Sequence, residues 1–101
     1  MSHKREIPKL NKDNFAAWKE LMKLHLVNIN DLGPKYLNAQ YKAPTGTMIV
    51  EEIVEKKNHN IMMIDIASTL SYVEFDEVKG CDTTHKMWTK INDNYGGNDN
   101  M

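Results

Sequence analysis

The stretch from Thr47 to Ser71 reads TMIVEEIVEKKNHNIMMIDIASTLS, and neither proline nor glycine interrupts it. Apolar residues recur along it at intervals of three and four, the period of one face of an α-helix. That face comprises Ile49, Ile53, Lys57, Ile61, Ile64, Ala67 and Leu70. We therefore predict one long central helix whose apolar stripe is buried by shorter helices on more than one side. Met62, Met63 and Ile66 widen this stripe, so only Asp65 and the side carrying Ser68 and Thr69 are expected to face water.

The length and composition of the chain are those of one soluble globular domain. Its 101 residues suffice for a single core, and the hydrophobic share of 41% and charged share of 27% are ordinary for such a domain. The one cysteine, Cys81, excludes an internal disulfide and fits a reducing compartment. No apolar run reaches the length of a membrane span, and the opening residues lead into no secretion signal. We therefore expect a cytoplasmic protein.

Charge is balanced over the whole chain but not along it. The net charge of −1 argues against a dedicated nucleic-acid binder. Residues 1–23 hold six basic groups against three acids, whereas residues 49–82 hold eight acids against three lysines. The two segments either meet head to tail between copies of the chain or form two solvated faces, and the second interpretation is the commoner outcome.

The chain divides into an arm, a helical domain and a tail. Residues 1–12 have no period and contain a proline, so we expect a flexible N-terminal arm from which Ile7 and Leu10 pack back on the body. Residues 13–95 form the domain. Residues 96–101 are mostly glycine and asparagine, and this composition predicts a C-terminal tail or linker.

Spacing and capping residues predict the first helices of this domain. A cap on Asp13 or Asn14 begins one helix, and Gly33–Pro34 ends it, because glycine permits a left-handed turn and proline cannot continue. Residues 35–41 are expected to form about two turns that lie as a lid across the core. The positions that face the core in these two segments are Phe15, Trp18, Met22, His25 or Leu26, Ile29, Tyr36, Leu37 and Tyr41.

The same signals predict two helices after the central one. Ser71 caps a short helix that Gly80 stops, and Asp82 or Thr83 caps the last helix. Their apolar positions are Phe75, Val78, Met87, Trp88, Ile91 and Tyr95. The indole N–H of each tryptophan is expected to reach a carbonyl at a helix end. The fold class is therefore all-α, a compact bundle of four to five helices around the long one.

The residues that could carry chemistry do not form a recognisable site. Cys81 and His85 are spaced like a nucleophile and its base, but nothing in the sequence orients His85. A zinc site from Cys81, His85, His59 and His25 lacks the paired spacings of structural zinc ligands. The acids between residues 76 and 82 are typical of a solvated helix face, and no glycine-rich phosphate loop is present. We predict no catalytic residue, no metal ligand, no cofactor and no enzymatic activity.

Several polar and sulfur-containing residues are expected to serve packing. His25 lies on the apolar face of the first helix as a core or rim histidine, and His59 and Asn60 are placed to hydrogen-bond to a crossing helix. Three methionines either fill the core, the commoner role at helical spacing, or build an adaptable groove. These are Met62, Met63 and Met87.

Three segments together resemble the Gag polyproteins of copia-type LTR retrotransposons. Residues 10–19, LNKDNFAAWK, are similar to the opening L-x-x-x-N-[FY]-x-x-W-[KR] of that family. Residues 83–91, TTHKMWTKI, are similar to its T-A-x-x-[AM]-W-x-x-[LI] helix, with Thr84 in place of the usual alanine and Tyr95 following. Between them, the stretch from Lys57 to Ser71 matches the family's long helix. The resemblance covers nearly the whole chain, from about Ile7 to Asn100.

The resemblance implies the N-terminal lobe of a capsid region. Family members continue into a second helical lobe and an RNA-binding zinc knuckle, so the tail at 96–101 would lead to that second lobe, and specific nucleic-acid binding does not carry over. The implied function is structural: copies associate with one another and with the downstream lobe through weak repeated contacts, and build virus-like particles. A membrane is not implied.

Three other functions are weighed against this one. A Gag-derived, domesticated binding module would hold a peptide or host protein in a groove between the first and central helices. A small hydrolase would use Cys81 and His85. A helix-turn-helix DNA reader would need a basic last helix, whereas Lys86 and Lys90 there are opposed by Asp93.

Overall fold

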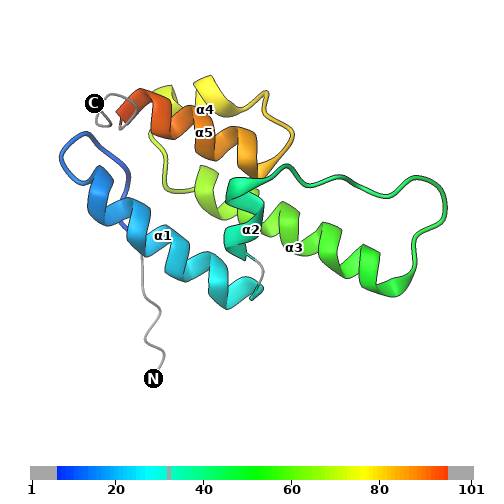
Figure 1. Cartoon of the computed structure of the whole chain (residues 1–101). Coiled ribbons are helices and arrows are strands. Elements are labelled where there is room, and N and C mark those ends of the chain that lie inside the picture. The colour runs from blue at the N-terminus through cyan, green and yellow to red at the C-terminus, as the bar shows by residue number, and fades with distance from the viewer. Residues whose placement is uncertain (1–6, 32, 96–101) are drawn as a thin grey trace.

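The computed structural model describes residues 7–31 and 33–95, and over these ranges the chain is helical with no strand. The helices are α1 (Phe15–Ile29), α2 (Gly33–Asn38), α3 (Val50–Ala67), α4 (Tyr72–Val78) and α5 (Thr84–Tyr95) (Figure 1). The prediction of an all-α bundle is confirmed. The tail at 96–101 and the first six residues of the predicted arm lie outside the described residues.

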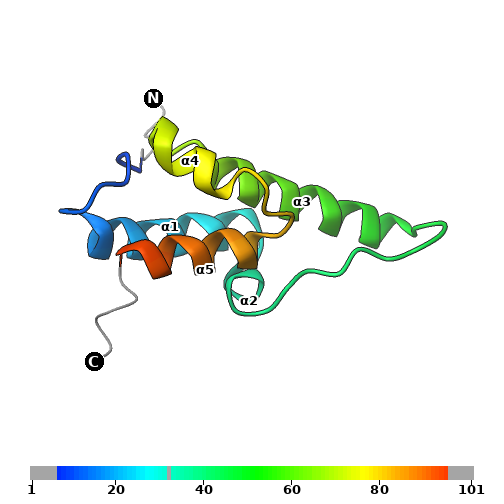
Figure 2. The ribbon, with the colours of Figure 1, turned by 90° about the horizontal axis from the view of Figure 1, so that it is seen from above.

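The helices are arranged in layers. Seen from above, α3 and α4 lie on one side, α2 on the other, and α1 and α5 between them (Figure 2). The core is centred on Trp18, which stacks on Trp88 with ring centroids 5.6 Å apart. Tyr36 and Leu37 of α2 are buried where α2 contacts α1 and α5, so the predicted lid is confirmed.

The segment before α1 is docked on the body rather than detached from it. Leu10 is buried, and its backbone N–H donates to the Thr69 carbonyl at 2.8 Å. Asn14 precedes α1 but makes no cap bond with its side chain. Its Oδ1 instead accepts the N–H of Asn11, and its Nδ2 donates to the Lys9 carbonyl. Asn14 therefore occupies a predicted cap position, but its side chain does not make the predicted cap bond. It holds the entering chain in place instead.

The predicted caps of the later helices are confirmed. The Ser71 hydroxyl accepts the N–H of Glu74, whose carboxylate accepts the N–H of Ser71, so α4 begins with a complete capping box. Thr83 accepts the N–H of Lys86 in the first turn of α5. The role predicted for Gly33 is wrong, because it begins α2 and has no positive φ. It lies so close to α1 that a Cβ there would stand 2.6 Å from the Leu26 carbonyl oxygen.

Met62 and Ile66 of α3 are buried as predicted, but most of the predicted stripe, from Ile49 to Ile64, faces water. The buried residues of α3 are His59, Met62 and Ile66, whereas Ile53 and Ile64 are 49% and 63% exposed. These two sets lie on nearly opposite sides of the helix. The predicted stripe contains Lys57, whose ammonium group cannot be buried unpaired, and rotation of that stripe into water removes the conflict.

The two halves of α3 also differ in their surroundings. The C-terminal half packs on the body, while the N-terminal half projects past it toward the connection from α2 (Figures 1 and 2). Thr69, expected to face water, is buried and accepts the Trp18 indole N–H at 3.0 Å. Its own hydroxyl donates to the Ile66 carbonyl, so the indole reaches the helix end through a hydroxyl and not directly.

Candidate interaction surface

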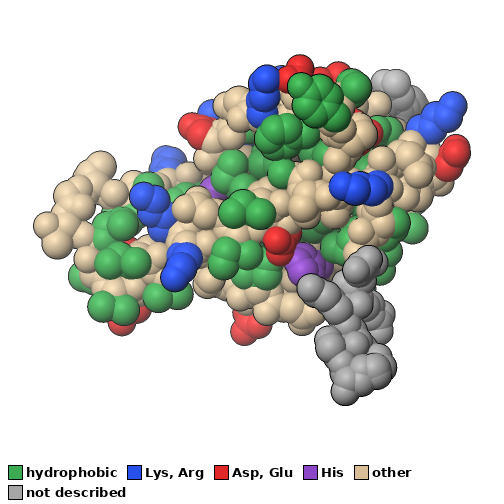
Figure 3. All heavy atoms as spheres, turned by 180° about the vertical axis from the view of Figure 1, so that it is seen from behind, with side chains coloured by type: hydrophobic (Ala, Val, Ile, Leu, Met, Phe, Trp, Pro, Cys, Tyr) green, Lys and Arg blue, Asp and Glu red, His purple; other side chains and the backbone are tan. Residues whose placement is uncertain are grey.

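The outward side of α3 is a row of exposed aliphatic side chains, which we call the α3 stripe. It consists of Val50, Ile53, Val54, Ile61 and Ile64, each between 37% and 71% exposed. Hydrophobic side chains gather across this face of the molecule, over α3 and α4, with charged groups scattered between them (Figure 3). Exposed apolar side chains gathered on one face in this way favour an interaction site.

The C-terminal end of the α3 stripe runs into a small hollow between α3, α4 and α5. The hollow has a volume of about 170 Å³. Its lining is almost wholly apolar, with Lys79 at the rim. The residues that line it are Met63, Ile64, Ala67, Phe75, Val78, Lys79, Cys81 and Met87. An apolar cavity of about 150 Å³ holds one benzene ring, so this hollow is about the size of one large side chain.

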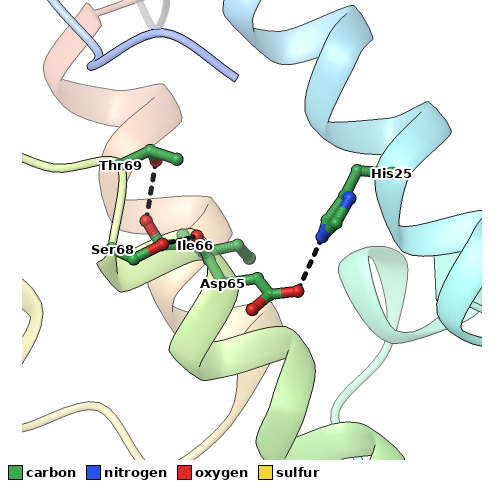
Figure 4. A network of polar contacts seen from close by, with 5 residues as sticks. All are labelled: His25, Asp65, Ile66, Ser68 and Thr69. Carbon is green, nitrogen blue, oxygen red and sulfur yellow. Dashed lines mark hydrogen bonds and ion pairs between the residues drawn. The ribbon is translucent and has the colours of Figure 1, made fainter. Parts of the chain in front are cut away.

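The seam between α1 and α3 is closed by polar contacts. His25 Nε2 lies 2.6 Å from Asp65 Oδ2, with both side chains about one-third exposed, as Figure 4 shows. His25 is therefore a rim histidine, as predicted. The same figure shows Thr69 and Ser68 turning back on the last turn of α3. A groove between the first and central helices, which the binding-module hypothesis placed here, is not where the apolar hollow lies.

The inward face of α3 holds a buried histidine. His59 Nε2 accepts the N–H of Thr84 at 3.1 Å, which confirms the predicted bond to a crossing helix. Its ring stacks on Tyr41, with centroids 4.5 Å apart, and meets Tyr36 edge-on. Burial lowers the pKa of His59, and the nearby carboxylates of Glu55 and Asp82 oppose that shift. The acceptor role of Nε2 requires the neutral ring.

A short chain of polar groups surrounds this histidine. The hydroxyl of Tyr36 donates to the Glu55 carboxylate. Burial raises the pKa of Tyr36, and the hydrogen bond to Glu55 and its charge add to the rise. Burial raises the pKa of Tyr41 as well, again with Glu55 contributing. These groups tie α2 and the connection at 39–49 to the inward face of α3, so the network serves the fold.

Most charged groups named in the sequence are engaged within the chain. Lys9 donates to the Ser68 carbonyl, Lys23 pairs with Glu20, and Lys19 lies over the Phe15 ring. On the acidic side, Lys79 pairs with Asp76, Lys86 pairs with Asp82, and several other acids accept hydrogen bonds. Glu52 and Glu74 accept backbone N–H groups, and Glu77 accepts from Asn94. These contacts favour the interpretation of two solvated faces over a head-to-tail contact.

One polar cleft touches this basic region. It lies between α1, α2 and α5, has a volume of about 300 Å³ and includes Lys19, Lys23, Asn38 and Trp88 in its lining. Both lysines already make contacts within α1, Lys23 with Glu20 and Lys19 with the Phe15 ring. Neither is therefore left free to bind a ligand in the cleft.

The residues considered for chemistry make separate contacts. Cys81 lines the apolar hollow, whereas His85 Nδ1 bonds the Leu37 carbonyl at 2.7 Å. Among residues 7–31 and 33–95, no group of three or more histidine, cysteine, aspartate and glutamate side chains is placed to hold a metal ion. Met62 and Met87 are buried, and Met63 and Met87 line the hollow, so the methionines serve core and groove alike.

The sequence did not point to α4 as part of a surface. Tyr72 and Val73 are 83% and 67% exposed, and Phe75 is also exposed although it shares a side with buried Val78. Ser71 signalled the helix, but a single apolar turn carries no sign of which residue faces out. The signal that was present, Lys57 on the same side of the helix as the α3 stripe, concerns α3 and not α4.

Comparison with family models, with curated proteins and with solved structures found no match for this chain. In the part of the chain that the structure describes, no helix combines the length and apolarity needed to cross a bilayer.

Proposed function

We propose that the chain is a non-enzymatic structural domain of a copia-type Gag, the N-terminal lobe of its capsid region. It would act in the cytoplasm by associating with further copies and with the downstream lobe to form virus-like particles. The observation that carries this proposal is the α3 stripe, an aliphatic helix face left in water at the edge of the fold. Association is the process that would remove that surface from water.

The proposal also draws on what the motif residues do. Phe15, Trp18, Trp88 and Tyr95 come from the two motif-bearing segments and stack in one series, with neighbouring centroids 5.6 to 6.3 Å apart. The residues that carry the resemblance therefore hold α1 against α5. They support a fold-defining role for the motifs and contribute no reactive group.

The physical demands of a shell agree with this surface. A closed shell needs contacts that are individually weak, because strong ones trap misassembled copies, and repetition supplies the total affinity. We expect one exposed helix face with one side-chain-sized hollow to give a contact smaller than a standard stable interface. We expect an isolated pair to dissociate readily and a large assembly to persist.

Sedimentation velocity across a range of concentrations tests the proposal. The wild-type chain is expected to associate as its concentration rises, and Ile53→Lys in the projecting half of α3 is expected to shift that association to about tenfold higher concentration. Val27→Lys is the control, because Val27 is an exposed aliphatic residue of α1 outside the α3 stripe. A wild-type chain that stays monomeric throughout, alone and with its downstream lobe, would overturn the proposal.

The second candidate is a Gag-derived binding module, and the apolar hollow favours it. A hollow that fits one side chain would anchor a peptide from another protein by a single aromatic or aliphatic residue. Saturable binding of such a peptide by a chain that never associates with itself, measured by titration calorimetry, would select this function over assembly.

A further inference from the structure

The first turn of α4 carries the most exposed large apolar side chain of the described residues. Tyr72 is 83% exposed and follows directly after the N-cap Ser71. The capping box fixes this turn, so the tyrosine projects from rigid backbone and not from a loop. A preorganised tyrosine loses little conformational entropy when it is buried, which is why tyrosine is enriched among the dominant residues of interfaces.

The apolar hollow opens on the same helix. Phe75 and Val78 of α4, with Lys79 at its C-cap, form one of its walls, and Met63, Ile64 and Ala67 of α3 form another. Its volume of about 170 Å³ matches one aromatic ring with its methylene group. A projecting ring and a ring-sized hollow thus lie within two turns of each other on one short helix.

We propose that Tyr72 of one copy occupies the α3–α4–α5 hollow of a second copy, and reciprocally, in a two-fold pair that joins the α4 helices antiparallel. This inference rests on the proposed self-association and names the contact that begins it. A two-fold pair uses the same patch on both partners, so one patch carrying both ring and hollow makes two identical contacts at once.

The charges of α4 fit this pairing. When the axis passes between Phe75 and Asp76, Tyr72 of one helix comes opposite Lys79 of the other. Lys79 is at the rim of the hollow and is paired with Asp76 at 2.7 Å. The ammonium group can then lie over the entering ring, a favourable cation–π arrangement, while each Asp76 is already neutralised by its lysine. Glu74 caps the helix and Glu77 accepts from Asn94, so the side of α4 that bears Tyr72 holds only the Asp76–Lys79 pair, and apposition of that side brings balanced charge together.

A peptide from another protein fits the hollow less completely. It would fill one hollow and leave Tyr72 in water, whereas a second copy buries both features twice. The α3 stripe ends at Ile64, which also lines the hollow, so the pair is continuous with the surface proposed above for assembly.

The first test compares Tyr72→Ser with Val73→Ser by sedimentation equilibrium. Both residues are highly exposed neighbours, but only Tyr72 shares the side of α4 with Lys79. We expect Tyr72→Ser to weaken dimer formation by about tenfold or more, as for a dominant interface residue, and Val73→Ser to change it by less than about twofold. Circular dichroism melts check that both variants fold. Equal effects of the two substitutions would overturn the pairing.

The second test uses Cys81 as a reporter, because it lines the hollow. A chain with Tyr72→Cys and Cys81→Ser is mixed with wild-type chain of different mass under mild oxidation. Two thiols lose two electrons and two protons to the added oxidant, diamide, and a disulfide joins position 72 of one chain to position 81 of the other. Val73→Cys with Cys81→Ser is the control, and only the first mixture is expected to give the mixed dimer.

The outcomes separate this inference from the function on which it rests. Association of the wild type that survives Tyr72→Ser, with no link between positions 72 and 81, overturns the Tyr72 contact and leaves assembly standing. A wild-type chain that never associates removes both. Loss of association in Tyr72→Ser together with the 72–81 link supports both.

Discussion

The two faces of α3 carry similar side chains, but one face is buried and the other is exposed. Met62 and Ile66 are fully buried, whereas Ile61 and Ile64, each within two residues of them, face water. Hydrophobicity therefore does not decide between the faces. The inward face also holds His59, whose polar atom is matched by the Thr84 N–H, while the outward face holds Lys57, which must remain hydrated.

The difference assigns the two faces to different tasks. The inward face contributes to the stability of one copy, because its burial is complete without any partner. The aliphatic side chains of the outward face remain 37% to 71% exposed after folding, and their further burial depends on what the copy meets. Substitutions on the two faces should therefore separate stability from association, and the tests below are arranged by the size of their expected effect on stability.

Removal of the Trp18 ring, which packs near the C-terminal end of α3, should have the largest effect on stability. Trp18 is completely buried, stacks on Trp88 and donates to Thr69. Trp18→Ala is expected to cost about 3–5 kcal/mol of unfolding free energy, a large part of the total for a domain of this size. Leu24→Ala on the exposed side of α1 is the control. Urea denaturation of both variants checks this, and a midpoint for Trp18→Ala as high as that of Leu24→Ala would contradict a buried role.

A matched pair of isoleucines gives the sharpest contrast between the faces. Ile66 is completely buried and Ile64 is 63% exposed, two positions along the same helix. Ile66→Ala is expected to destabilise the chain by about 2–5 kcal/mol, while Ile64→Ala stays within about 0.5–1 kcal/mol. Thermal denaturation at low concentration measures the stability of single copies. Equal losses would mean that α3 has no preferred inward face.

Much of the fold could be predicted because its signals are local. Ser71 and Thr83 lie directly before apolar periodic segments, and their capping bonds involve residues three positions away. The lid from Tyr36 and Leu37 was likewise marked by two apolar residues in a short segment. Capping bonds in particular depend on residues nearby in the chain and not on how the helices are oriented.

The orientation of α3 could not be derived from spacing alone. Isoleucine and methionine surround its C-terminal half, so the periodicity fits several rotations, and Lys57 was the one residue that opposed the rotation chosen. Thr69 was expected in water because a hydroxyl is polar, but the indole of Trp18, 51 positions away, supplies its buried partner. The place of Gly33 also depends on a distant backbone, the Leu26 carbonyl across the α1–α2 turn.

The candidate surface was the least predictable part. Its hollow forms only when α3, α4 and α5 meet, and Tyr72 becomes notable only when its exposure is known. Cys81 and His85 are only four positions apart, but their contacts, with the apolar hollow and with the Leu37 carbonyl, are set by packing.

The smallest expected effect concerns pH and the polar centre of the inward face. Tyr36, Tyr41, Glu55 and Asp82 surround His59, and its Nε2 accepts the N–H of Thr84. Burial lowers the pKa of the folded imidazole below the ordinary 6.5, so the unfolded chain binds the proton first as pH falls. Stability should therefore be unaffected by this group well above pH 6.5 and decline below it, by at most about 1.4 kcal/mol per pH unit for one proton.

His59→Gln separates this contribution from every other titrating group. The amide oxygen of glutamine can accept the Thr84 N–H but takes up no proton, so we expect a loss of about 1 kcal/mol at neutral pH and a shallower decline between pH 6.5 and 5. Urea unfolding at a series of pH values measures the slope of each chain. If the wild type and the variant lose stability in parallel over that interval, His59 is not held neutral by its burial. The inward face would then tolerate a charge as the outward face tolerates Lys57, and the contrast between the two faces would rest on shape alone.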